Sequence, residues 1–500
     1  MIKFIKLNEF FYKIDTTYEI NVKLNKLFSI RSPGFMFNPL YRRGMWNGYK
    51  ELYNKDYCFH GLIPFIIKFA EKNGIQTIGY NQPIIKSNID DFLNNLKISN
   101  RDKKNDTINQ IEYRPYQRDA IKLALSKEKD IIVSPTSSGK SLIIYSVCQY
   151  ILKELKENEN ILIVVPTVTL VEQMYDDFRD YSYLNGFDVK ENCCRVHAGL
   201  TLDLSKKIII STRSSLANKE KSFFEHFRCV IIDECQGAQA WNYSGNKRAK
   251  EFHKILFSSI NAKYILGFTG TFPDEVLYRT TLQALFGGYD EVTNYETLLE
   301  NDWISNFQIN AIELNYQSGL PNYKRDYRSE LESIRTSGYR RNFLKKLLLK
   351  NKNNQLLLFV AVEKHSRIII EDLQNDERFK DYEIYLLDGS SSVEEKNKIK
   401  DKIEKQNNII LLATYKLLGA GWSVNNLHNI IFVDPLKSKQ TVIQAIGRGL
   451  RKLDDTKVCQ IWDIIDKFEW KNTLYKHWLE RENHYKQYNL DYKYIKISKE

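Results

Sequence analysis

From residue 111 onward, short apolar runs alternate with longer segments in which apolar positions recur at helical spacing. The first set of runs is rich in Ile and Val: Ile131–Val133, Ile161–Val165, Ile208–Ile210, Val230–Ile232 and Tyr264–Phe268. Helical segments such as Ser141–Leu155 and Thr169–Tyr181 lie between them. Continuous β-branched runs joined by helices are typical of parallel strands that are buried on both faces. The pattern therefore predicts an α/β domain with a parallel sheet.

The same alternation recurs towards the C-terminus, and it predicts a second parallel sheet in tandem with the first. The expected strands are Gln355–Val360, Glu383–Leu387, Ile409–Ala413, Ile430–Val433 and Val458–Ile461. The stretch from Trp470 is rich in Tyr and Lys, and we expect it to form a helical cap on this second sheet.

The first hundred residues follow a different pattern. They combine two strand-like runs, Lys3–Ile14 and Tyr18–Leu27, with an aromatic, basic and turn-rich stretch over residues 34–48. Ser99–Gln110 has no apolar period and is expected to be a linker. The predicted organisation is a small α+β domain (1–98), a linker (99–111), two α/β domains (112–303 and 304–465) and a helical, Tyr- and Lys-rich extension (466–500).

Composition narrows the class of protein. The 500 residues are 43% hydrophobic and 27% charged, which fits a soluble globular protein of several domains. No apolar run approaches the roughly 20 residues of a membrane-spanning helix, and we expect the seven cysteines to be reduced thiols of a cytoplasmic protein. The net charge is +12, and residues 1–104 contribute +8 of it through 17 Lys/Arg and 9 Asp/Glu. This excess favours a polyanionic partner, although an A/T-rich coding sequence would also enrich lysine.

A loop of small residues lies between the first predicted strand and the helix that follows it. Backbone N–H groups of such a loop, together with the helix N-terminus, can cradle phosphates. Lys140 would reach the β- and γ-phosphates, and the Ser141 hydroxyl would coordinate Mg²⁺. The strict pattern has glycine at position 134, where this chain has Ser, so an ordinary turn before a helix is the alternative. The candidate ATP-binding residues of the loop are Pro135, Thr136, Ser137, Ser138, Gly139, Lys140 and Ser141.

Two acidic residues follow the apolar strand expected at residues 230–232. Asp233 would hold Mg²⁺ through water, and Glu234 would orient and deprotonate an attacking water molecule. The alternative is an acidic pair that caps the next helix. Because the pair follows a Lys-Ser loop in the same predicted sheet, the catalytic interpretation is favoured.

Near the end of the second sheet, Gln444, Arg448 and Arg451 recur at i, i+4 and i+7 and would share one helical face. We expect the two arginines to act as arginine fingers on the γ-phosphate, where they would neutralise charge that develops in the transition state. An exposed basic helix is the alternative. The candidate catalytic residues are therefore Lys140, Glu234, Gln444, Arg448 and Arg451.

Across residues 113–451 the motifs follow the order found in superfamily 2 nucleic-acid helicases, which the chain resembles. The matching segments are Tyr113–Gln117, Val165–Thr167, Ser211–Leu216, Thr269–Thr271, Thr414–Gly421 and Gln444–Arg451. The resemblance implies two tandem RecA-like parallel-sheet domains. It also implies a role for each of several residues: Gln117 in reading adenine, Gly421 in ATP binding, and Thr269, Gly270 and Thr271 in coupling hydrolysis to movement.

Thr167 and Thr212 stand at the carboxyl ends of predicted strands in the two segments that resemble strand-binding motifs. Hydroxyl and backbone N–H groups at these places can hold phosphates without reading bases. The same hydroxyls would equally serve as helix N-caps.

Three departures bear on the subgroup. Ser137 replaces a glycine of the phosphate loop, Gln236 replaces the final His or Asp of the acidic motif, and Ser423 replaces the Asp of the fifth motif. None removes a group needed for hydrolysis, but together they argue against the DEAD-box and DEAH subgroups and hence against an RNA substrate. Within the superfamily, the chain resembles the UvsW-type recombination helicases of tailed phages.

The UvsW-type resemblance includes residues 37–48, which are similar to that family's small N-terminal nucleic-acid-binding module. It implies DNA contacts by Arg42, Arg43 and Trp46, while a structural aromatic turn is the alternative.

We therefore expect an ATP- and Mg²⁺-dependent DNA helicase or translocase that unwinds or branch-migrates branched DNA in phage-type recombination, replication and repair. Expected partners are forked, branched or single-stranded DNA, together with single-strand-binding or recombination proteins, and no membrane. The expected location is the cytoplasm, that of the host if the protein is viral. The alternatives are an RNA helicase, a restriction-type translocase, or an ATP-gated DNA-binding or annealing factor that does not unwind.

Overall fold

The computed structural model describes residues 1–500 except 82–87, 103–104, 198–200, 241–246, 317–325, 352, 361–363, 416, 418–425, 437, 449–457 and 498–500. The chain divides into two compact units. The first comprises residues 1–134 and 139–292, and the second comprises residues 135–138 and 293–500. In the described part of the chain, none of the helices is both long enough and apolar enough to span a bilayer.

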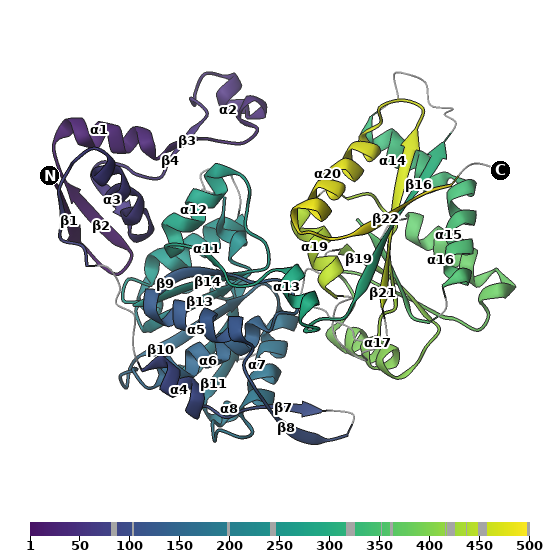
Figure 1. Ribbon diagram of the computed structural model, residues 1–500, viewed down its shortest axis with the longest axis horizontal. Coiled ribbons are helices and arrows are strands. Elements are labelled where there is room, and N and C mark those ends of the chain that lie inside the picture. Colours follow the sequence, from purple (N-terminus) through teal and green to yellow (C-terminus); the bar gives the residue numbers. More distant parts are fainter. Residues whose placement is uncertain are drawn as a thin grey trace. The chain divides into compact units, whose positions relative to one another are not determined.

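The first unit begins with a small module built on a four-stranded sheet of order β5-β2-β1-β6, in which only β6 runs parallel to its neighbour (Figure 1). A second, two-stranded antiparallel ladder, β3-β4, carries an arm of residues 29–51. The elements of the module are β1 Ile2–Lys6, β2 Phe11–Asp15, α1 Tyr18–Leu27, β3 Ser29–Arg31, α2 Pro39–Arg42, β4 Tyr49–Glu51, β5 Tyr57–Phe59, α3 Ile63–Lys72 and β6 Thr77–Ile78.

The strand expected at Tyr18–Leu27 is wrong, because the structure has helix α1 there. Apolar and polar residues alternate through most of this segment, which mimics a strand. Ile20, Leu24 and Leu27 are also spaced for one helical face, and only Leu24 is buried. Because this helix buries a single residue, its sequence does not distinguish the helical period of apolar residues from the strand period.

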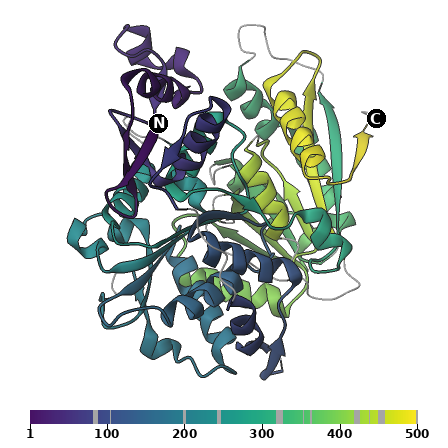
Figure 2. The same cartoon turned by 60° about the vertical axis from the view of Figure 1, so that its left-hand side comes forward.

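The rest of the first unit is a seven-stranded, wholly parallel sheet of order β11-β12-β10-β13-β14-β9-β15 (Figures 1 and 2). Its strands are β9 Lys129–Val133, β10 Asn160–Val165, β11 Cys193–Val196, β12 Ile208–Thr212, β13 Phe227–Asp233, β14 Tyr264–Thr269 and β15 Asp290–Glu291. The main helices are α5 Pro115–Lys127, α6 Lys140–Leu152, α7 Val168–Ser182, α11 Lys247–Ser258 and α12 Val276–Phe286. Ile131 and Val133 belong to one buried apolar cluster and Ile132 to another, so both faces of the sheet are covered, as predicted.

The stretch expected as a linker at 99–111 is also structured. β7 (Ile98–Asp102) and β8 (Thr107–Ile111) form an antiparallel hairpin. The Ser99 hydroxyl donates a hydrogen bond of 2.8 Å to the Asp180 carbonyl oxygen on α7. The hairpin exposes every residue of Thr107–Gln110, so its polar sequence carries no apolar alternation from which a strand would be predicted.

The small module shares its apolar core with the large sheet. Phe59 stacks on Phe257 of α11, with ring centroids 5.7 Å apart. The buried His60 ring lies with Nε2 3.1 Å from the Leu285 carbonyl oxygen, and burial lowers the pKa of this histidine well below its ordinary value. The Lys129 ammonium donates to a Glu9 carboxylate oxygen at 2.9 Å. The module is therefore fixed to the first sheet as one body.

The second unit contains another seven-stranded parallel sheet, of order β18-β19-β17-β20-β21-β16-β22. Its strands are β16 Phe307–Tyr316, β17 Gln355–Phe359, β18 Glu383–Leu387, β19 Ile409–Thr414, β20 Asn429–Phe432, β21 Cys459–Phe468 and β22 Tyr492–Ile497. The main helices are α14 Tyr327–Thr336, α15 Gly338–Lys350, α16 Lys364–Gln374, α17 Val393–Lys405, α19 Lys439–Arg448 and α20 Thr473–Gln487. The C-terminal extension thus supplies the expected helix and also an edge strand, β22, which the sequence analysis did not anticipate.

Gly61 tests the attachment of the module. A Cβ atom at this position would lie 1.9 Å from the Gln283 carbonyl oxygen on α12, a contact that requires the backbone to shift. We expect Gly61→Ala to destabilise the first unit by about 1–3 kcal/mol, the usual cost of overpacking, and to lower the melting temperature by several degrees in calorimetry. Gly389→Ala, where a Cβ would meet no atom within 4 Å, is the matched control. Equal melting temperatures for the two variants would contradict this account of the attachment.

Candidate nucleotide-binding site

The phosphate loop connects β9 to α6 at the carboxyl edge of the first sheet. Two of its residues have left-handed backbone, Ser137 at φ 68° and Gly139 at φ 84°. The Ser134 amide donates to the Thr269 carbonyl oxygen of β14 at 2.9 Å, and the Ser138 hydroxyl donates to the Pro135 carbonyl oxygen at 2.7 Å. The loop therefore has a fixed curl, in which a serine takes the conformation that glycine adopts most readily.

The two side chains expected to serve the phosphates lie at the start of α6. The Lys140 ammonium donates to the Ser134 carbonyl oxygen at 3.0 Å, so the cation is already held against the loop. The Ser141 hydroxyl oxygen lies 2.9 Å from the Tyr181 hydroxyl oxygen on α7. Both side chains are half-buried, which suits a site that gathers phosphate oxygens at a helix N-terminus.

Gln117 reaches the same loop from α5. It is 4% exposed, and its carboxamide oxygen accepts a hydrogen bond of 3.0 Å from the Arg114 backbone. A Cβ atom on Gly139 would lie 2.5 Å from the Gln117 amide nitrogen. Glycine is therefore required at position 139 for two reasons: its φ is positive, and Gln117 lies too close for a side chain. The sequence predicted Gln117 for nucleotide binding, and the structure brings it to the phosphate loop.

The acidic pair lies at the same edge of the sheet. Asp233 ends β13, is 8% exposed and is level with Phe268 of the adjacent strand β14. Glu234 follows with a left-handed backbone at φ 52°, which turns the chain sharply after the strand. Gln236 donates a hydrogen bond from its amide nitrogen to a Glu234 carboxylate oxygen. The departure at position 236 therefore provides a neutral donor that orients the candidate general base.

The donors near the loop suit a hard divalent cation. The Ser141 hydroxyl and the Asp233 carboxylate are oxygen ligands, and Mg²⁺ usually binds one or two protein oxygens together with water and substrate phosphates. Among the described residues, no group of three or more His, Cys, Asp or Glu side chains is arranged to hold a metal ion. The Ser141 hydroxyl and the Asp233 carboxylate are thus of the chemistry that Mg²⁺ takes as ligands.

The Thr-Gly-Thr segment is joined to the loop through the backbone. The Thr269 carbonyl oxygen accepts from Ser134, while its hydroxyl donates to the Thr271 carbonyl oxygen at 2.8 Å and accepts from the Thr271 amide at 3.1 Å. Thr269 is fully buried and Thr271 is 6% exposed. A displacement of the phosphate loop would therefore be transmitted directly to this turn.

The threonines of the two strand-binding motifs have local partners in the structure. The Thr167 hydroxyl accepts from the Leu170 amide at 3.4 Å at the start of α7. The Thr212 hydroxyl accepts from the Ser215 amide at 3.2 Å at the start of α9 (Arg213–Leu216). Both are helix N-caps, so the capping alternative is confirmed, and contact with a nucleic-acid strand stays a prediction.

In the second unit, Gln444 and Arg448 lie four residues apart on helix α19. Arg451 and Gly421, like Ser423, lie outside the described residues. The segment before α19 is held by a buried network that the sequence analysis missed. Although burial alone would raise the pKa of Asp434, the neighbouring His365 ring, 3.7 Å away, and the hydrogen-bonded Arg335 guanidinium lower it to about 2.

A second part of this network comes from the C-terminal helix. Arg481 on α20 is 1% exposed and donates to the Leu436 carbonyl oxygen at 2.8 Å. It also donates to both carboxylate oxygens of Asp463 on β21, at 2.8 to 3.1 Å. The residues just before α19 are thus fixed from α20. These residues are far apart in the sequence, and their pairing could not be predicted from it.

The residues expected to touch DNA in the small module lie on its arm. Arg42 and Arg43 are exposed, and Trp46 is half-buried. The Trp46 indole nitrogen donates to the Tyr49 carbonyl oxygen at 2.7 Å. Trp46 is therefore partly structural. Arg42 also donates a hydrogen bond of 3.1 Å to the Met36 carbonyl oxygen, although both arginines are exposed.

Three family models match successive parts of the chain. Residues 2–78 match "DNA helicase UvsW, N-terminal", residues 110–274 match "Type III restriction enzyme, res subunit", and residues 339–452 match "Helicase conserved C-terminal domain". The matches follow the small module, the first large sheet and the second large sheet in order.

Individual proteins give the same result. "ATP-dependent DNA helicase uvsW" of Enterobacteria phage T4 is 28% identical over 510 aligned residues, which cover 96% of each chain. The crystal structure of T4 UvsW superposes with a TM-score of 0.50 at 25% identity and covers 99% of both chains. The DEAD-box helicase Mss116 bound to single-stranded RNA matches with a TM-score of 0.57 at 15% identity, which is a likeness of fold alone. The expected pair of RecA-like domains after a small N-terminal domain is confirmed.

Ser137 gives a direct test of the loop conformation. At φ 68° a glycine is unstrained, whereas a β-branched side chain is strongly disfavoured. We expect Ser137→Gly to keep the parent's affinity for a fluorescent ATP analogue. Ser137→Val should bind it about 5- to 30-fold more weakly, which corresponds to roughly 1–2 kcal/mol of strain. Circular dichroism should show both variants folded, and equal binding by the two would refute the left-handed loop.

Proposed function

We infer that this protein is an ATP-dependent DNA helicase of the UvsW type. The observation that carries this is the meeting of the phosphate loop, Gln117, the acidic pair and the Thr-Gly-Thr turn at one edge of the first sheet. These groups lie in a chain that resembles the phage T4 helicase along its whole length. The three family models cover the small module, the first large sheet and the second large sheet in that order.

In the proposed mechanism, each residue at the loop has a separate task. Lys140 and the backbone amides of the loop bind the β- and γ-phosphates, while Gln117 holds the adenine. Ser141 and Asp233 would hold Mg²⁺, which supplies positive charge to the phosphates when it is bound. Glu234 accepts a proton from the attacking water, and the hydrogen bond from Gln236 keeps its carboxylate oriented.

The proposed coupling runs through the backbone of the first sheet. Loss of the γ-phosphate would move the phosphate loop, and the bond from Ser134 to Thr269 would carry that movement into the Thr-Gly-Thr turn. Thr167 and Thr212 begin helices at the same carboxyl edge, where helix N-termini can hold the backbone of a DNA strand. Contacts of this kind grip any sequence, as a translocating motor requires.

We propose that the substrate is branched, forked or single-stranded DNA, and that the protein unwinds or branch-migrates it in phage recombination, replication and repair. The basic arm with Arg42 and Arg43 would contact the DNA backbone, in a way that weakens as salt is raised. Single-strand-binding and recombination proteins would act on the same DNA, in the cytoplasm of the infected host.

Two substitutions separate nucleotide binding from chemistry. Lys140→Ala removes the positive charge at the phosphates, so ATP affinity and turnover should both fall. Glu234→Gln keeps the size of the side chain but removes the base, so ATP should still bind while hydrolysis stops. Equilibrium binding of labelled ATP and release of phosphate on forked DNA measure the two effects. A Glu234→Gln protein that hydrolyses ATP at the parent's rate would remove the basis of this mechanism.

We further propose that Arg448 and Arg451 are the arginine fingers that the resemblance implies. Arg448→Ala should then lower ATP turnover by about 10³-fold or more while ATP binding persists, because the group acts on charge that forms in the transition state. Lys439→Ala, at the other end of α19, is the control. Unchanged turnover in Arg448→Ala would contradict the proposal, as would loss of ATP binding in a folded protein.

A panel of forked, four-way, duplex and single-stranded DNA with matched RNA decides between the remaining functions. We expect ATP-dependent strand displacement on forked and four-way DNA. Stimulation of ATP hydrolysis by RNA alone would instead identify an RNA helicase. Nucleotide-dependent DNA binding without displacement would identify an annealing factor.

A further inference from the structure

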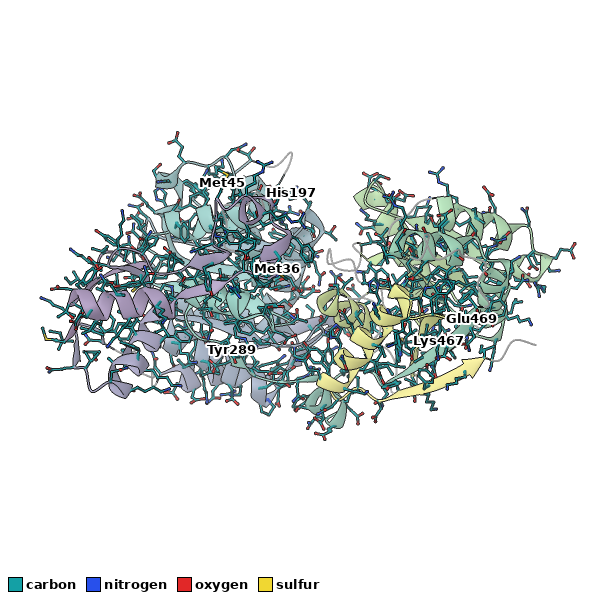
Figure 3. All side chains as sticks on the ribbon, turned by 90° about the horizontal axis from the view of Figure 1, so that it is seen from above. Met36, Met45, His197, Tyr289, Lys467 and Glu469 are labelled. Atoms are coloured by element: carbon teal, nitrogen blue, oxygen red, sulfur yellow. The ribbon has the colours of Figure 1, made fainter. Side chains whose placement is uncertain are left out.

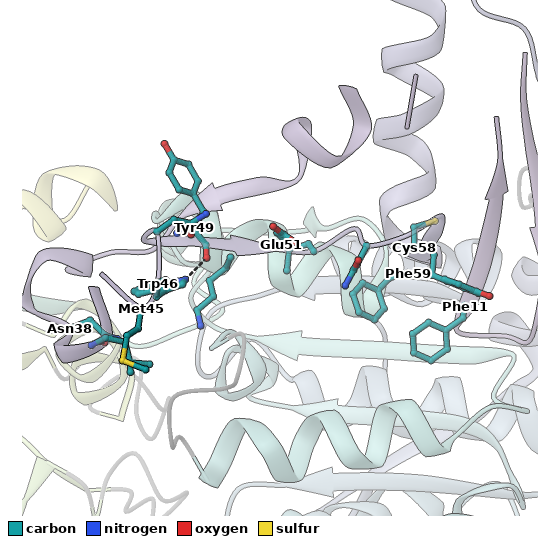
Figure 4. A pocket seen from close by; sticks show the side chains of 14 residues that line it. Phe11, Asn38, Met45, Trp46, Tyr49, Glu51, Cys58 and Phe59 are labelled. Atoms are coloured by element: carbon teal, nitrogen blue, oxygen red, sulfur yellow. Dashed lines mark hydrogen bonds between the residues drawn. The ribbon is translucent and has the colours of Figure 1, made fainter. Parts of the chain in front are cut away.

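The arm of the small module, residues 29–51, borders a groove of about 530 Å³ (Figure 4). Met45 and Trp46 lie at one end of it, and Phe11, Cys58 and Phe59 lie at the other. The volume falls in the range of pockets that bind small molecules and cofactors, about 300–1,000 Å³. The groove is formed entirely by the small module, and neither the phosphate loop nor the acidic pair contributes to it.

Apolar side chains that line the groove are exposed to solvent. Tyr57 is 50% exposed and Met45 is 71% exposed, and Met45 is labelled in Figure 3. Trp46 is held in place by the bond from its indole nitrogen to the Tyr49 carbonyl oxygen, drawn as a dashed line in Figure 4. An aromatic ring fixed in this way loses little conformational entropy when a second ring stacks on it.

Other aromatic side chains of the arm are already used by the module itself. Phe35 packs edge-on against Tyr41, with centroids 4.7 Å apart, and the Arg31 guanidinium lies 4.5 Å from the Phe35 centroid. A Cβ atom on Gly48 would come within 2.9 Å of the Phe35 ring, so the turn closes tightly around it. Phe35 is therefore structural, whereas Phe37 is 73% exposed and lies outside the lining of the groove.

The charge of the arm indicates an anion. Residues 29–51 contain four Lys/Arg, namely Arg31, Arg42, Arg43 and Lys50, and one acidic residue, Glu51, which also lines the groove. None of the four forms an ion pair with a described carboxylate. The Lys50 ammonium lines the groove and lies 4.9 Å from the Trp46 centroid, and burial lowers its pKa. A half-buried cation of this kind gains from a negatively charged neighbour.

We propose that this groove binds one unpaired nucleotide at a DNA branch point, with its base against the aromatic wall and its phosphate against Lys50. The proposal rests on the function inferred above and adds the feature of the DNA that is recognised. A base has a flat π-face for Trp46 or Tyr57, and the phosphate of a nucleotide is attracted by the net positive charge of the arm. An apolar protein segment would fill the same walls but would bring no negative charge to the four cations.

The test uses the full-length protein without ATP and three forks that differ at a single junction position. That position carries an unpaired adenine, an abasic site or a paired adenine. Stacking of one base is worth about 1–3 kcal/mol, so we expect the unpaired-adenine fork to bind about 5- to 150-fold more tightly than the abasic fork. Replacing that adenine with 2-aminopurine should show quenched fluorescence on binding.

Matched variants assign the preference to the groove. Tyr57→Ala should reduce the preference for the unpaired base, whereas Tyr18→Ala, at a tyrosine that is 83% exposed on α1, should keep it. Lys50→Gln should weaken binding of the unpaired-adenine fork more than Lys26→Gln, at an exposed lysine of α1. Changing Arg42 and Arg43 together to Ala should weaken all three forks by a similar factor, because their contacts are to the DNA backbone.

The outcomes separate this proposal from the function on which it rests. A parent protein that unwinds forks with ATP, but binds unpaired-adenine and abasic forks equally, overturns the groove proposal alone. A Tyr57→Ala variant that keeps the full preference also overturns it, because the base is then recognised outside the groove. A parent without DNA-stimulated ATP hydrolysis overturns the inferred function instead.

Discussion

The parallel arrangement of the first sheet is the constraint on which the rest of the site depends. Because all seven strands run in one direction, their carboxyl ends share one edge, and whatever follows each strand is delivered there. The phosphate loop follows β9, the acidic pair follows β13 and the Thr-Gly-Thr turn follows β14, and these three strands are consecutive neighbours. Segments more than a hundred residues apart in the chain are thereby brought into a single site, and the bond from Ser134 to Thr269 links two of them.

The small module is packed onto the first sheet and belongs to the same unit. The module shares one apolar core with the first sheet. It is also attached by aromatic stacking at Phe257, the close contact at Gly61 and the Lys129–Glu9 pair. The arm is therefore carried by the same body that holds the phosphate loop. A groove that binds a nucleotide on this arm would hold the branch in a constant position relative to the first sheet, so that each step of the motor starts from the same geometry.

The second unit relies on buried charge as well as on apolar packing. Arg340 pairs with Asp466 and Arg481 pairs with Asp463, and all four side chains are almost fully buried. Removing one member of such a pair would leave an uncompensated charge, which costs far more than the pair contributes. These pairs tie α15 and α20 to β21, and Arg481 also reaches the segment before α19. The C-terminal extension, including edge strand β22, is thus part of the second domain rather than an appendage to it.

Strands and motifs that depend on residues close together in the chain could be predicted from the sequence. Continuous apolar runs located most of the central strands of both sheets, because a strand buried on both faces needs apolar residues at every position. The exception is β16, which lies between β21 and β22 and was not among the expected strands. The loop ending in Gly139-Lys140-Ser141 and the acids at Asp233 and Glu234 stood out because their chemistry requires fixed spacing. Three of the four edge strands were missed, whereas β18 was predicted: β11 and β15 are short, and β22 is exposed over most of its length.

Elements and contacts that depend on residues distant in the sequence became clear only from the folded structure. Tyr18–Leu27 became a helix although its sequence alternates like a strand, and residues 98–111 became a hairpin in which Ser99 bonds to α7. Ser137 looked like a departure from the loop pattern, and only its positive φ showed that the serine takes the glycine conformation. The pairing of Arg481 with Asp463 and the groove beside Trp46 arise from chain segments that meet only after folding. Sequence periodicity reports which face of an element is buried, but not which other element buries it.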